Sequence, residues 1–309
     1  MEYVKNYIFK TIDFLKSNYL YLIWFIIYFT IAWAILGGTG RSFIAVLIIY
    51  SISITIALSP LGEWLLKTIE NCREPLTEQE QDYLLPLFEE VYHSSKEVYP
   101  LLYDGIKIYI IDVMYINAFA IGRKTIAVTK GALETFSADE LKGVIAHEFG
   151  HLMHGHTKAL LLSVIGNFFF TIIVVLFRLI FWVTQIICAL VGQGDWSGII
   201  MSIVLAVVRF SVEVNIFIFI NLSQIILSLN SRINEFQADT FAYDIGYGRE
   251  LTGALYLLDK ISMGGKLTLS ERLKSSHPHT AKRIQNLEQL ENEELEELEE
   301  LQTQQSITP

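Results

Sequence analysis

Cysteine and positive charge are both scarce in this chain of 309 residues. The two cysteines, Cys72 and Cys188, lie far apart in the sequence, so the chain indicates neither a disulfide framework nor a thiol site. The 23 lysine and arginine residues are outnumbered by 33 acidic residues, which leaves a net charge of -10 at pH 7. This balance argues against nucleic acid as a partner and against docking to anionic lipid. The sequence also lacks a phosphate-binding glycine loop, an internal repeat and a lipidation motif.

Hydrophobic residues, in contrast, make up 52% of the chain and cluster in runs of about membrane length. Residues 20–36 and 43–58 form two such runs on either side of a short polar turn, and together they predict a transmembrane hairpin. A cleaved signal peptide is not expected, because the first run is too long and no small-residue cleavage site precedes the second. Residues 160–191 and 198–229 predict a second hairpin.

The charges that flank these runs predict how the hairpins are oriented. Positive residues lie at the run ends that would meet on one side of a membrane: Lys5, Lys10, Lys16, Lys67, Arg73, Lys158 and Arg232. The turn of the second hairpin, residues 192–196, has none, and Arg41 in the first turn is the one exception. Because lysine and arginine are enriched in cytoplasmic segments, both termini and the polar segments are predicted to face the cytoplasm from a multiply crossed cell inner (plasma) membrane.

Three charged residues interrupt the second pair of runs: Arg178 in the first, and Arg209 with Glu213 in the second. Counted from the cytoplasmic ends at about 1.5 Å per residue, all three reach a similar depth near the outer interface. They predict either an interhelical ion pair or a functional polar site, and the sequence leaves both interpretations open.

A metal-binding pattern lies just before the second hairpin. His147, Glu148 and His151 form the pattern H-E-x-x-H, and a capping box at Ser137 and Glu140 predicts that their helix begins about ten residues earlier. On a helix the two histidines lie one turn apart on the same face, so both imidazoles can reach one ion. A hydrolytic zinc site uses three protein ligands and keeps its fourth position for water, and Glu148 is the expected base for this water.

Glu235 is the best candidate for the third ligand, and it lies just after the second hairpin. If its segment is helical, Asp239 lies one turn further on the same face and can accept a hydrogen bond from a ligand histidine. A solvated acidic helix face is the alternative for these two carboxylates, and the motif upstream favours the zinc site. His154 and His156 are not needed as ligands, because two histidines, one glutamate and one water complete the coordination of one Zn²⁺ ion per chain.

The polar segment before the metal-binding pattern predicts a small α+β region. Residues 77–98 predict a helix, and residues 106–111 and 125–129 predict two strands. Between these strands, the stretch Asn117-Ala118-Phe119-Ala120 suits an exposed edge beside the histidine helix, where a substrate peptide can add as a further strand. An ordinary hairpin segment would have the same composition, so both interpretations remain.

These motifs follow one another in a familiar order. They run from Asn117-Ala118-Phe119-Ala120 through the H-E-x-x-H helix to Ser231-Arg232 with Glu235-Phe236-Gln237-Ala238-Asp239, and then to His277-Pro278 with Arg283-Ile284. In this order they resemble the HtpX family of membrane zinc endopeptidases, to which the larger CaaX prenyl proteases are related. A CaaX protease has more membrane spans around a large chamber, which this chain is too short to build. The resemblance covers residues from about 20 to 287 and leaves out the acidic tail.

The resemblance implies roles for the matching residues of this chain. It implies that zinc is bound by His147, His151 and Glu235, that Glu148 activates the water, and that Asp239 orients a ligand histidine.

The resemblance also implies that the strand around Asn117 receives the substrate and that His277 and Arg283 lie near the site. His277 would then help to stabilise the oxyanion of a tetrahedral intermediate. It fits the start of the last helix equally well, because Pro278 follows it. Arg283 fits a salt bridge inside the soluble domain better than a contact with substrate.

The predicted fold is membrane α-helical plus α+β, with four transmembrane helices in two hairpins and a cytoplasmic zincin-like catalytic domain. The first hairpin belongs to an N-terminal segment, residues 1–61. The second, residues 159–230, separates the two parts of the catalytic domain, residues 62–158 and 231–287. The acidic tail, residues 288–309, predicts a solvated helix end followed by disorder.

The predicted function is that of a membrane-integral, zinc-dependent endopeptidase that hydrolyses peptide bonds of membrane or misfolded proteins at the cytoplasmic face, in protein quality control. The substrate class follows from the resemblance alone. A CaaX-type prenyl-protein protease and a non-catalytic, zinc-stabilised membrane scaffold are the alternatives. Glu148 argues against the scaffold, since metal binding alone would not require it. Polypeptide substrates and the lipid bilayer are the expected partners, and the sequence indicates no oligomeric state.

Overall fold

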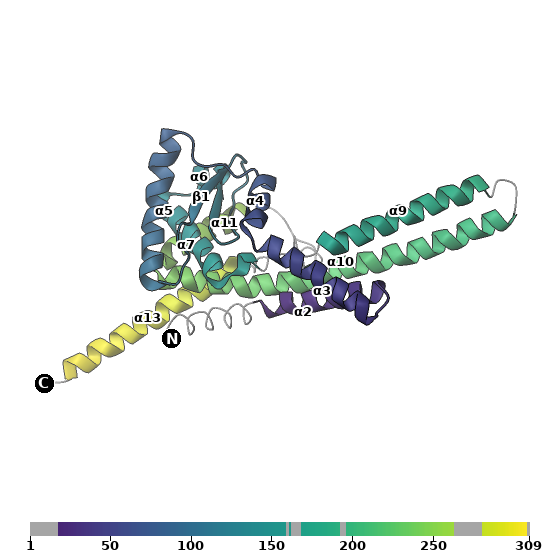
Figure 1. Cartoon of the computed structure of the whole chain (residues 1–309). Coiled ribbons are helices and arrows are strands. Elements are labelled where there is room, and N and C mark those ends of the chain that lie inside the picture. Colours follow the sequence, from purple (N-terminus) through teal and green to yellow (C-terminus); the bar gives the residue numbers. More distant parts are fainter. Residues whose placement is uncertain (1–17, 159–160, 162–167, 192–195, 263–279, 308–309) are drawn as a thin grey trace.

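The computed structural model describes residues 18–158, 161, 168–191, 196–262 and 280–307. This part of the chain is mostly helical, with one small sheet. A globular part contains the sheet, and two helical hairpins lead away from it, of which the longer projects well beyond the shorter (Figure 1).

The helices lie in four groups along the chain. The first hairpin and the helix after it are α2 (Tyr19–Ile35), α3 (Gly40–Ala57) and α4 (Pro60–Ile69). The globular part begins with α5 (Glu78–Val98), β1 (Lys107–Ile111), β2 (Ala118–Ile121), β3 (Thr125–Thr129), α6 (Lys130–Thr135) and α7 (Ala138–His154). The longer hairpin is α9 (Phe168–Val191) with α10 (Trp196–Asp244), and α11 (Gly248–Ser262) and α13 (Thr280–Ile307) complete the described chain.

The sheet has three strands in the order β1, β3, β2. Strand β1 runs parallel to β3 and β2 runs antiparallel to it, so β2 lies at an edge. Helix α7 packs next to β2. The stretch beside the histidine helix therefore lies at the sheet edge and also forms a hairpin with β3, so both predicted interpretations describe it. The strand begins at Ala118, and Asn117 directly precedes it.

The core of the globular part forms where α7 packs against α5, α11 and the sheet. Leu141, Ile145 and Phe149 of α7 are fully buried there, as their helical spacing predicts. Phe88 of α5 stacks on Phe149, with 5.5 Å between ring centroids. Full burial of a side chain of this size stabilises the fold by roughly 1.5–3 kcal/mol, so this stripe fixes the position of α7 in the fold.

Helices α2 and α3 form the first predicted helical hairpin. Phe29 lies edge-on to Phe43, with ring centroids 5.4 Å apart. The side chain of Thr39 accepts a hydrogen bond from the backbone N–H of Ser42, and this cap starts α3 at Gly40. The helix thus begins before the apolar run that starts at residue 43, because the cap depends on a polar side chain that hydropathy does not register.

Helices α9 and α10 form the longer hairpin, and an ion pair joins them. Arg178 donates two hydrogen bonds to the carboxylate of Glu213, at 2.9 and 2.7 Å. Arg209 donates to the side-chain oxygen of Gln185 at 2.8 Å. The predicted interhelical ion pair is therefore confirmed for Arg178 and Glu213, while Arg209 binds a neutral partner.

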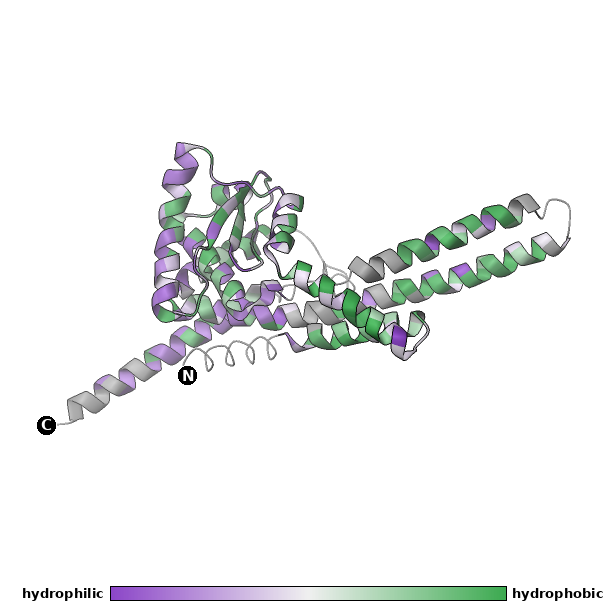
Figure 2. Ribbon diagram, in the orientation of Figure 1, coloured by the Kyte–Doolittle hydropathy of each residue, from purple (hydrophilic) through white to green (hydrophobic). Residues whose placement is uncertain are grey.

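Two helical segments in the described part of the chain are long and apolar enough to cross a membrane by length and composition, Gly40–Ala57 in α3 and Gly198–Ile218 in α10. Two shorter apolar segments accompany them, Leu22–Ala34 in α2 and Val174–Cys188 in α9. Apolar residues dominate both hairpins (Figure 2). Many of their large side chains are exposed, and an exposed apolar surface of this extent marks a contact with lipid or protein.

Helix α10 continues for 49 residues without a break. Its first half contains the membrane-length apolar segment, and its second half contains Glu235 and Asp239. The expected division at residue 231 falls inside this helix. Because one helix holds both parts, the two carboxylates and the apolar segment keep a fixed relation to each other.

The described part of the acidic tail, residues 288–307, is helical throughout, so the helix is longer than the short helix end expected there. Tyr256 of α11 donates to the carboxylate of Glu288 at 2.6 Å, and Arg249 donates to that of Glu291 at 2.6 Å. These bonds fix the first half of α13 against α11. They are long-range contacts, which the composition of the tail does not reveal.

Two glycines of α7 bring neighbouring helices against its backbone. A Cβ atom added at Gly150 would lie 2.8 Å from the Cα atom of Ala238 in α10. One added at Gly143 would lie 2.2 Å from the backbone nitrogen of Leu251 in α11. Real Cβ atoms essentially never make contacts this short, so only glycine allows α10 and α11 to approach α7 so closely.

We expect Gly150→Ala to destabilise the protein, because the added methyl group must push α10 away from α7. Overpacking of this kind costs about 1–3 kcal/mol, and the midpoint of thermal unfolding should fall by several degrees. The measurement is thermal unfolding of the purified chain in detergent. Gly40→Ala is the control, since a Cβ atom at Gly40 meets nothing within 4 Å. Equal midpoints for both variants would contradict the close packing.

Candidate metal centre

The two histidines of the H-E-x-x-H pattern lie one turn apart on α7. The helix begins where the capping box predicts, because Ser137 Oγ accepts from the backbone N–H of Glu140 and the Glu140 carboxylate accepts from that of Ser137. The Nε2 atoms of His147 and His151 are 3.1 Å apart. Both side chains are largely buried, and their two Nε2 atoms are close enough to bind one ion.

The carboxylate of Glu235 completes a set of three donor groups. One of its oxygens lies 3.4 Å from Nε2 of His147, and the other lies 3.5 Å from Nε2 of His151. Ligand bonds of about 2.0–2.2 Å in a tetrahedral zinc site place neighbouring donor atoms about 3.3–3.6 Å apart. Two imidazoles and one carboxylate at separations of 3.1 to 3.5 Å therefore fit a zinc ion.

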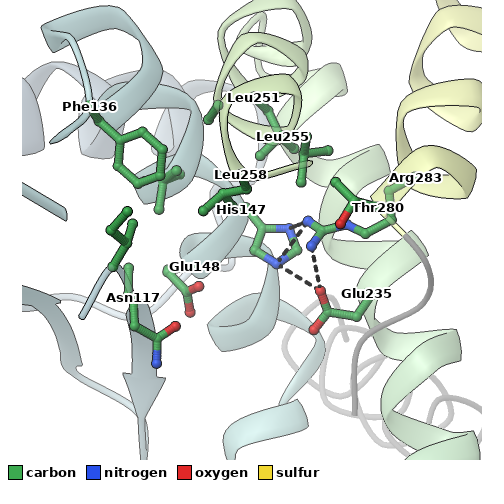
Figure 3. Close-up of a pocket in the computed structure, with 14 residues that line it drawn as sticks. Asn117, Phe136, His147, Glu148, Glu235, Leu251, Leu255, Leu258, Thr280 and Arg283 are labelled. Atoms are coloured by element: carbon green, nitrogen blue, oxygen red, sulfur yellow. Dashed lines mark hydrogen bonds and ion pairs between the residues drawn. The ribbon is translucent and has the colours of Figure 1, made fainter. Parts of the chain in front are cut away.

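Two charged side chains, Asp239 and Arg283, contact these donor groups. Asp239 Oδ1 lies 2.9 Å from Nδ1 of His147, which leaves Nε2 of that ring directed at the donor set. Arg283 donates to both oxygens of Asp239, at 2.6 and 2.8 Å, and its Nη1 lies 2.9 Å from Glu235 Oε2. Figure 3 shows the guanidinium beside His147 and Glu235. The structure thus places Arg283 in a buried salt bridge, as the sequence favours.

These buried charges shift the pKa values of their neighbours. Burial raises the pKa of Asp239, but the positive charge of Arg283 and the bond to His147 outweigh it, so the net shift is downward. For His147, burial and the Arg283 charge lower the pKa, and the carboxylates of Asp239 and Glu235 outweigh both and raise it to about 9. The carboxylates of Asp239 and Glu235 therefore favour a positive charge at this position, which a bound cation would also provide.

His151 has a different partner on its second ring nitrogen. Its Nδ1 lies 2.9 Å from Nδ1 of His156, and Nε2 of His156 lies 3.0 Å from the side-chain oxygen of Gln237. His156 is only 5% exposed, and burial together with the neighbouring His151 and His154 holds its pKa well below the usual value. His156 therefore contacts the ring nitrogen of His151 that does not face Glu235.

Glu148 lies where two cavities meet beside β2. The smaller cavity has a volume of about 250 Å³ and the larger one about 560 Å³, and Glu148 lines both. Its carboxylate points into the smaller cavity between Asn117 and His147 (Figure 3). Side-chain donor atoms of His147, Glu148 and His151 all lie within 4.8 Å of one another. Glu148 is therefore close to the metal position and also faces open space.

The two cavities share Asn117 and Ala118, at the start of the edge strand, and differ in their other walls. The smaller one has a largely apolar wall from α6–α7 and α11: Phe136, Val144, Leu251, Ala254, Leu255 and Leu258. The larger one is bounded by α4 and by the part of α10 near Ser231: Leu66, Ile69, Glu70, Ser231 and Asn234. Asn117 and Ala118 line both cavities, whereas Phe119 and Ala120 line only the larger one. His277 lies outside the described residues.

Residues 79–291 match the family model described as peptidase family M48. The chain belongs to peptidase family M48. The match begins in α5 and ends in α13, so it includes both helices that supply the three donor groups. The H-E-x-x-H pattern on α7 also lies within the matched residues.

Several relatives bear the HtpX name, and two of them illustrate the similarity. Protease HtpX of Shewanella frigidimarina is 28% identical over 282 residues, which cover 84% of this chain and 87% of that protein. Protease HtpX of Idiomarina loihiensis is 28% identical over 198 residues, which cover 56% of this chain and 61% of that protein, less than two thirds of its length. The expected resemblance to HtpX proteases is confirmed. Among solved structures, S. mikatae Ste24p is similar over 92% of this chain and 66% of that chain, with 21% identity and a TM-score of 0.43.

The roles of several residues at this M48 centre cannot be recognised from the sequence alone. An apolar residue such as Leu255 has the same helical spacing whether it faces a core or a cavity. Gln237 lies within the stretch from Glu235 to Asp239, but its partner His156 is 81 positions away. Only the fold brings these two together.

We expect Glu235→Gln to weaken zinc binding strongly and Glu148→Gln to preserve it, because carboxylate oxygens of Glu235 lie 3.4 and 3.5 Å from the two histidine Nε2 atoms. The loss for Glu235→Gln should exceed the roughly 10–100-fold typical of groups that only support a ligand. Zinc content after dialysis and competition with a chromophoric chelator measure the effect. If Glu148→Gln loses the metal and Glu235→Gln keeps it, the third ligand is Glu148.

Proposed function

We propose that this member of family M48 is a zinc-dependent endopeptidase integral to the membrane, with its active site on the cytoplasmic side. The observation that carries this proposal is the donor set of His147, His151 and Glu235, whose separations of 3.1 to 3.5 Å suit one tetrahedral zinc ion beside Glu148. These three residues would hold one zinc ion per chain. Asp239 would fix the tautomer of His147 through its Nδ1 atom.

A zinc ion bound here would supply Lewis acidity toward a water molecule and toward the scissile carbonyl. Glu148 would accept a proton from the attacking water as the general base. The water oxygen then bonds to the carbonyl carbon, the C–N bond breaks, and Glu148 returns the proton to the leaving amine. Arg283 is held by Asp239 and Glu235, so it stabilises the ligand set and is assigned no substrate contact. His277 stays a prediction as a group that stabilises the oxyanion.

The cavities on both sides of Glu148 favour a substrate that continues in both directions from the scissile bond. Strand β2 lies at the sheet edge, where an extended polypeptide can pair with its backbone. The smaller cavity, with its apolar wall, suits one side chain of such a polypeptide. A chain that passes along β2 through both cavities would be cut internally, which is endopeptidase activity.

The membrane placement rests on the two apolar hairpins. We assign α2, α3, α9 and α10 to four membrane spans, and the flanking lysine and arginine residues favour a cytoplasmic position for both termini and for the metal centre. The larger cavity reaches α4, which follows the α3 span directly. We therefore assign membrane or misfolded proteins as substrates, in a quality-control role, with the bilayer as the second partner.

Glu148→Gln should retain the fold and the bound zinc and lose cleavage of an unfolded protein such as casein. General-base catalysis contributes roughly 10²–10⁴-fold, so a loss in that range is expected. Product formation by the purified, zinc-loaded chain measures it. Glu134→Gln on α6 is the control, because Glu134 is exposed and lines neither cavity. Cleavage by Glu148→Gln at the unaltered rate would remove the mechanism.

The orientation predicts different labelling of two engineered cysteines in a chain that lacks Cys72 and Cys188. In intact cells an impermeant maleimide should label Trp196→Cys, at the start of α10, and should label Lys130→Cys, at the start of α6, only after the membrane is permeabilised. Trp196 is 78% exposed and Lys130 is also exposed, so both thiols are accessible once the reagent reaches them. Labelling of Lys130→Cys from outside would reverse the topology.

A further inference from the structure

The two candidate ligand histidines are supported by different kinds of groups. His147 places its Nδ1 atom 2.9 Å from the carboxylate of Asp239, a common arrangement behind a metal-bound histidine. His151 places its Nδ1 atom 2.9 Å from Nδ1 of another imidazole, that of His156. Nε2 of His156 in turn lies 3.0 Å from the side-chain oxygen of Gln237, so the three side chains form a series of hydrogen bonds. Neither His156 nor Gln237 belongs to the donor set.

The hydrogen-bond chemistry of these three side chains allows one arrangement that is compatible with zinc. A neutral imidazole has one N–H donor and one acceptor nitrogen. If Nε2 of His151 binds a metal, its Nδ1 must carry the hydrogen and donate it to Nδ1 of His156. Nε2 of His156 then carries a hydrogen and donates it to Oε1 of Gln237, the atom that the structure places there.

The opposite arrangement would prevent ligation. A donor in place of Oε1 at Gln237 would make Nε2 of His156 an acceptor, and His156 would then donate from Nδ1 to His151. Nε2 of His151 would carry a hydrogen and have no lone pair for a metal. Ligation by His151 is therefore compatible with the side-chain oxygen of Gln237 facing His156, as in this structure.

The fold holds this chain of hydrogen bonds rigidly. Gly155 ends α7 in the left-handed conformation, with φ of 72°, and turns the backbone so that His156 reaches back to the ring of His151. The His154 ring stacks on that of His156, with centroids 5.5 Å apart. His156 is only 5% exposed, and it also lines the larger cavity.

We propose that His156 and Gln237 are positioning residues that hold His151 in the tautomer and orientation that bind zinc. This inference rests on the proposed zinc site and adds two residues to it. The hydrogen bond between His156 and Gln237 also joins two distant parts of the chain. His156 precedes α9, and Gln237 lies in the second half of α10. The geometry of the hairpin base and the orientation of His151 are thus linked through one hydrogen bond.

The test compares zinc affinities of full-length variants in detergent by competition with a chromophoric chelator. His156→Leu and Gln237→Leu remove the acceptor groups and should weaken zinc binding roughly 10–100-fold, the range for groups that support a ligand histidine. His156→Asn places an amide oxygen near the former Nδ1 position, and Gln237→Glu keeps an acceptor for His156, so both should stay within about threefold of the unaltered chain.

Thr157→Val is the matched control, because Thr157 is also about 5% exposed and its hydroxyl donates a hydrogen bond, to the backbone oxygen of Gly122. Loss of that bond should lower the thermal stability and leave the zinc affinity unchanged. If Thr157→Val weakens zinc binding as much as His156→Leu, or if His156→Asn is as weak as His156→Leu, then packing and not hydrogen bonding is responsible and the proposal is overturned.

A measurement on the unaltered chain does not depend on how the variants fold. Selective ¹⁵N labelling of histidine in the zinc-loaded chain should show His151 protonated at Nδ1 and His156 protonated at Nε2. A His156 ring protonated at Nδ1 would overturn the proposal. The zinc affinity of the unaltered chain separates the proposed function from the positioning role. If the unaltered chain binds no zinc, the proposed function is wrong. If it binds zinc tightly and His156→Leu binds zinc with the same affinity, only the positioning role is wrong.

Discussion

Helices α7 and α10 meet at Gly150, where the backbone of one helix lies against Ala238 of the other. Ala238 lies between Glu235 and Asp239, so the same close approach that buries it also turns both carboxylates toward the histidines of α7. A larger side chain at either helix would increase the distance between them, and donor separations of 3.1 to 3.5 Å would be lost. The metal centre is a product of this helix contact.

The contact also brings several negatively charged carboxylates together in the protein interior. Their charge must be compensated by nearby cations. Glu148, Glu235 and Asp239 are all buried, and Arg283 is the cation that contacts the last two. Three carboxylates and one guanidinium leave two negative charges, which a divalent cation would neutralise. Arg283 comes from α13, so the last described helix completes the site that α7 and α10 begin.

Local structure was largely predictable, because it depends on neighbours in the sequence. The capping box at Ser137 starts α7 and the strand Thr125–Thr129 forms as its composition indicates, whereas the composition of β2 fits an edge strand and an ordinary hairpin segment equally well. The unbroken course of α10 was not predictable, because a change from apolar to polar residues resembles a boundary even where the backbone continues unchanged.

The sequence by itself determined the reactive groups: two histidines at helical spacing, a glutamate beside one of them, and one pair of acidic residues, Glu235 and Asp239, one helical turn apart. Such spacing is meaningful without a fold, because the helix fixes which residues share a face. Only the tertiary structure decided that Arg283 pairs with Asp239, that His156 and Gln237 support His151, and that two cavities meet at Glu148. These relations join residues that are far apart in the chain, and only helix packing sets the distances between them.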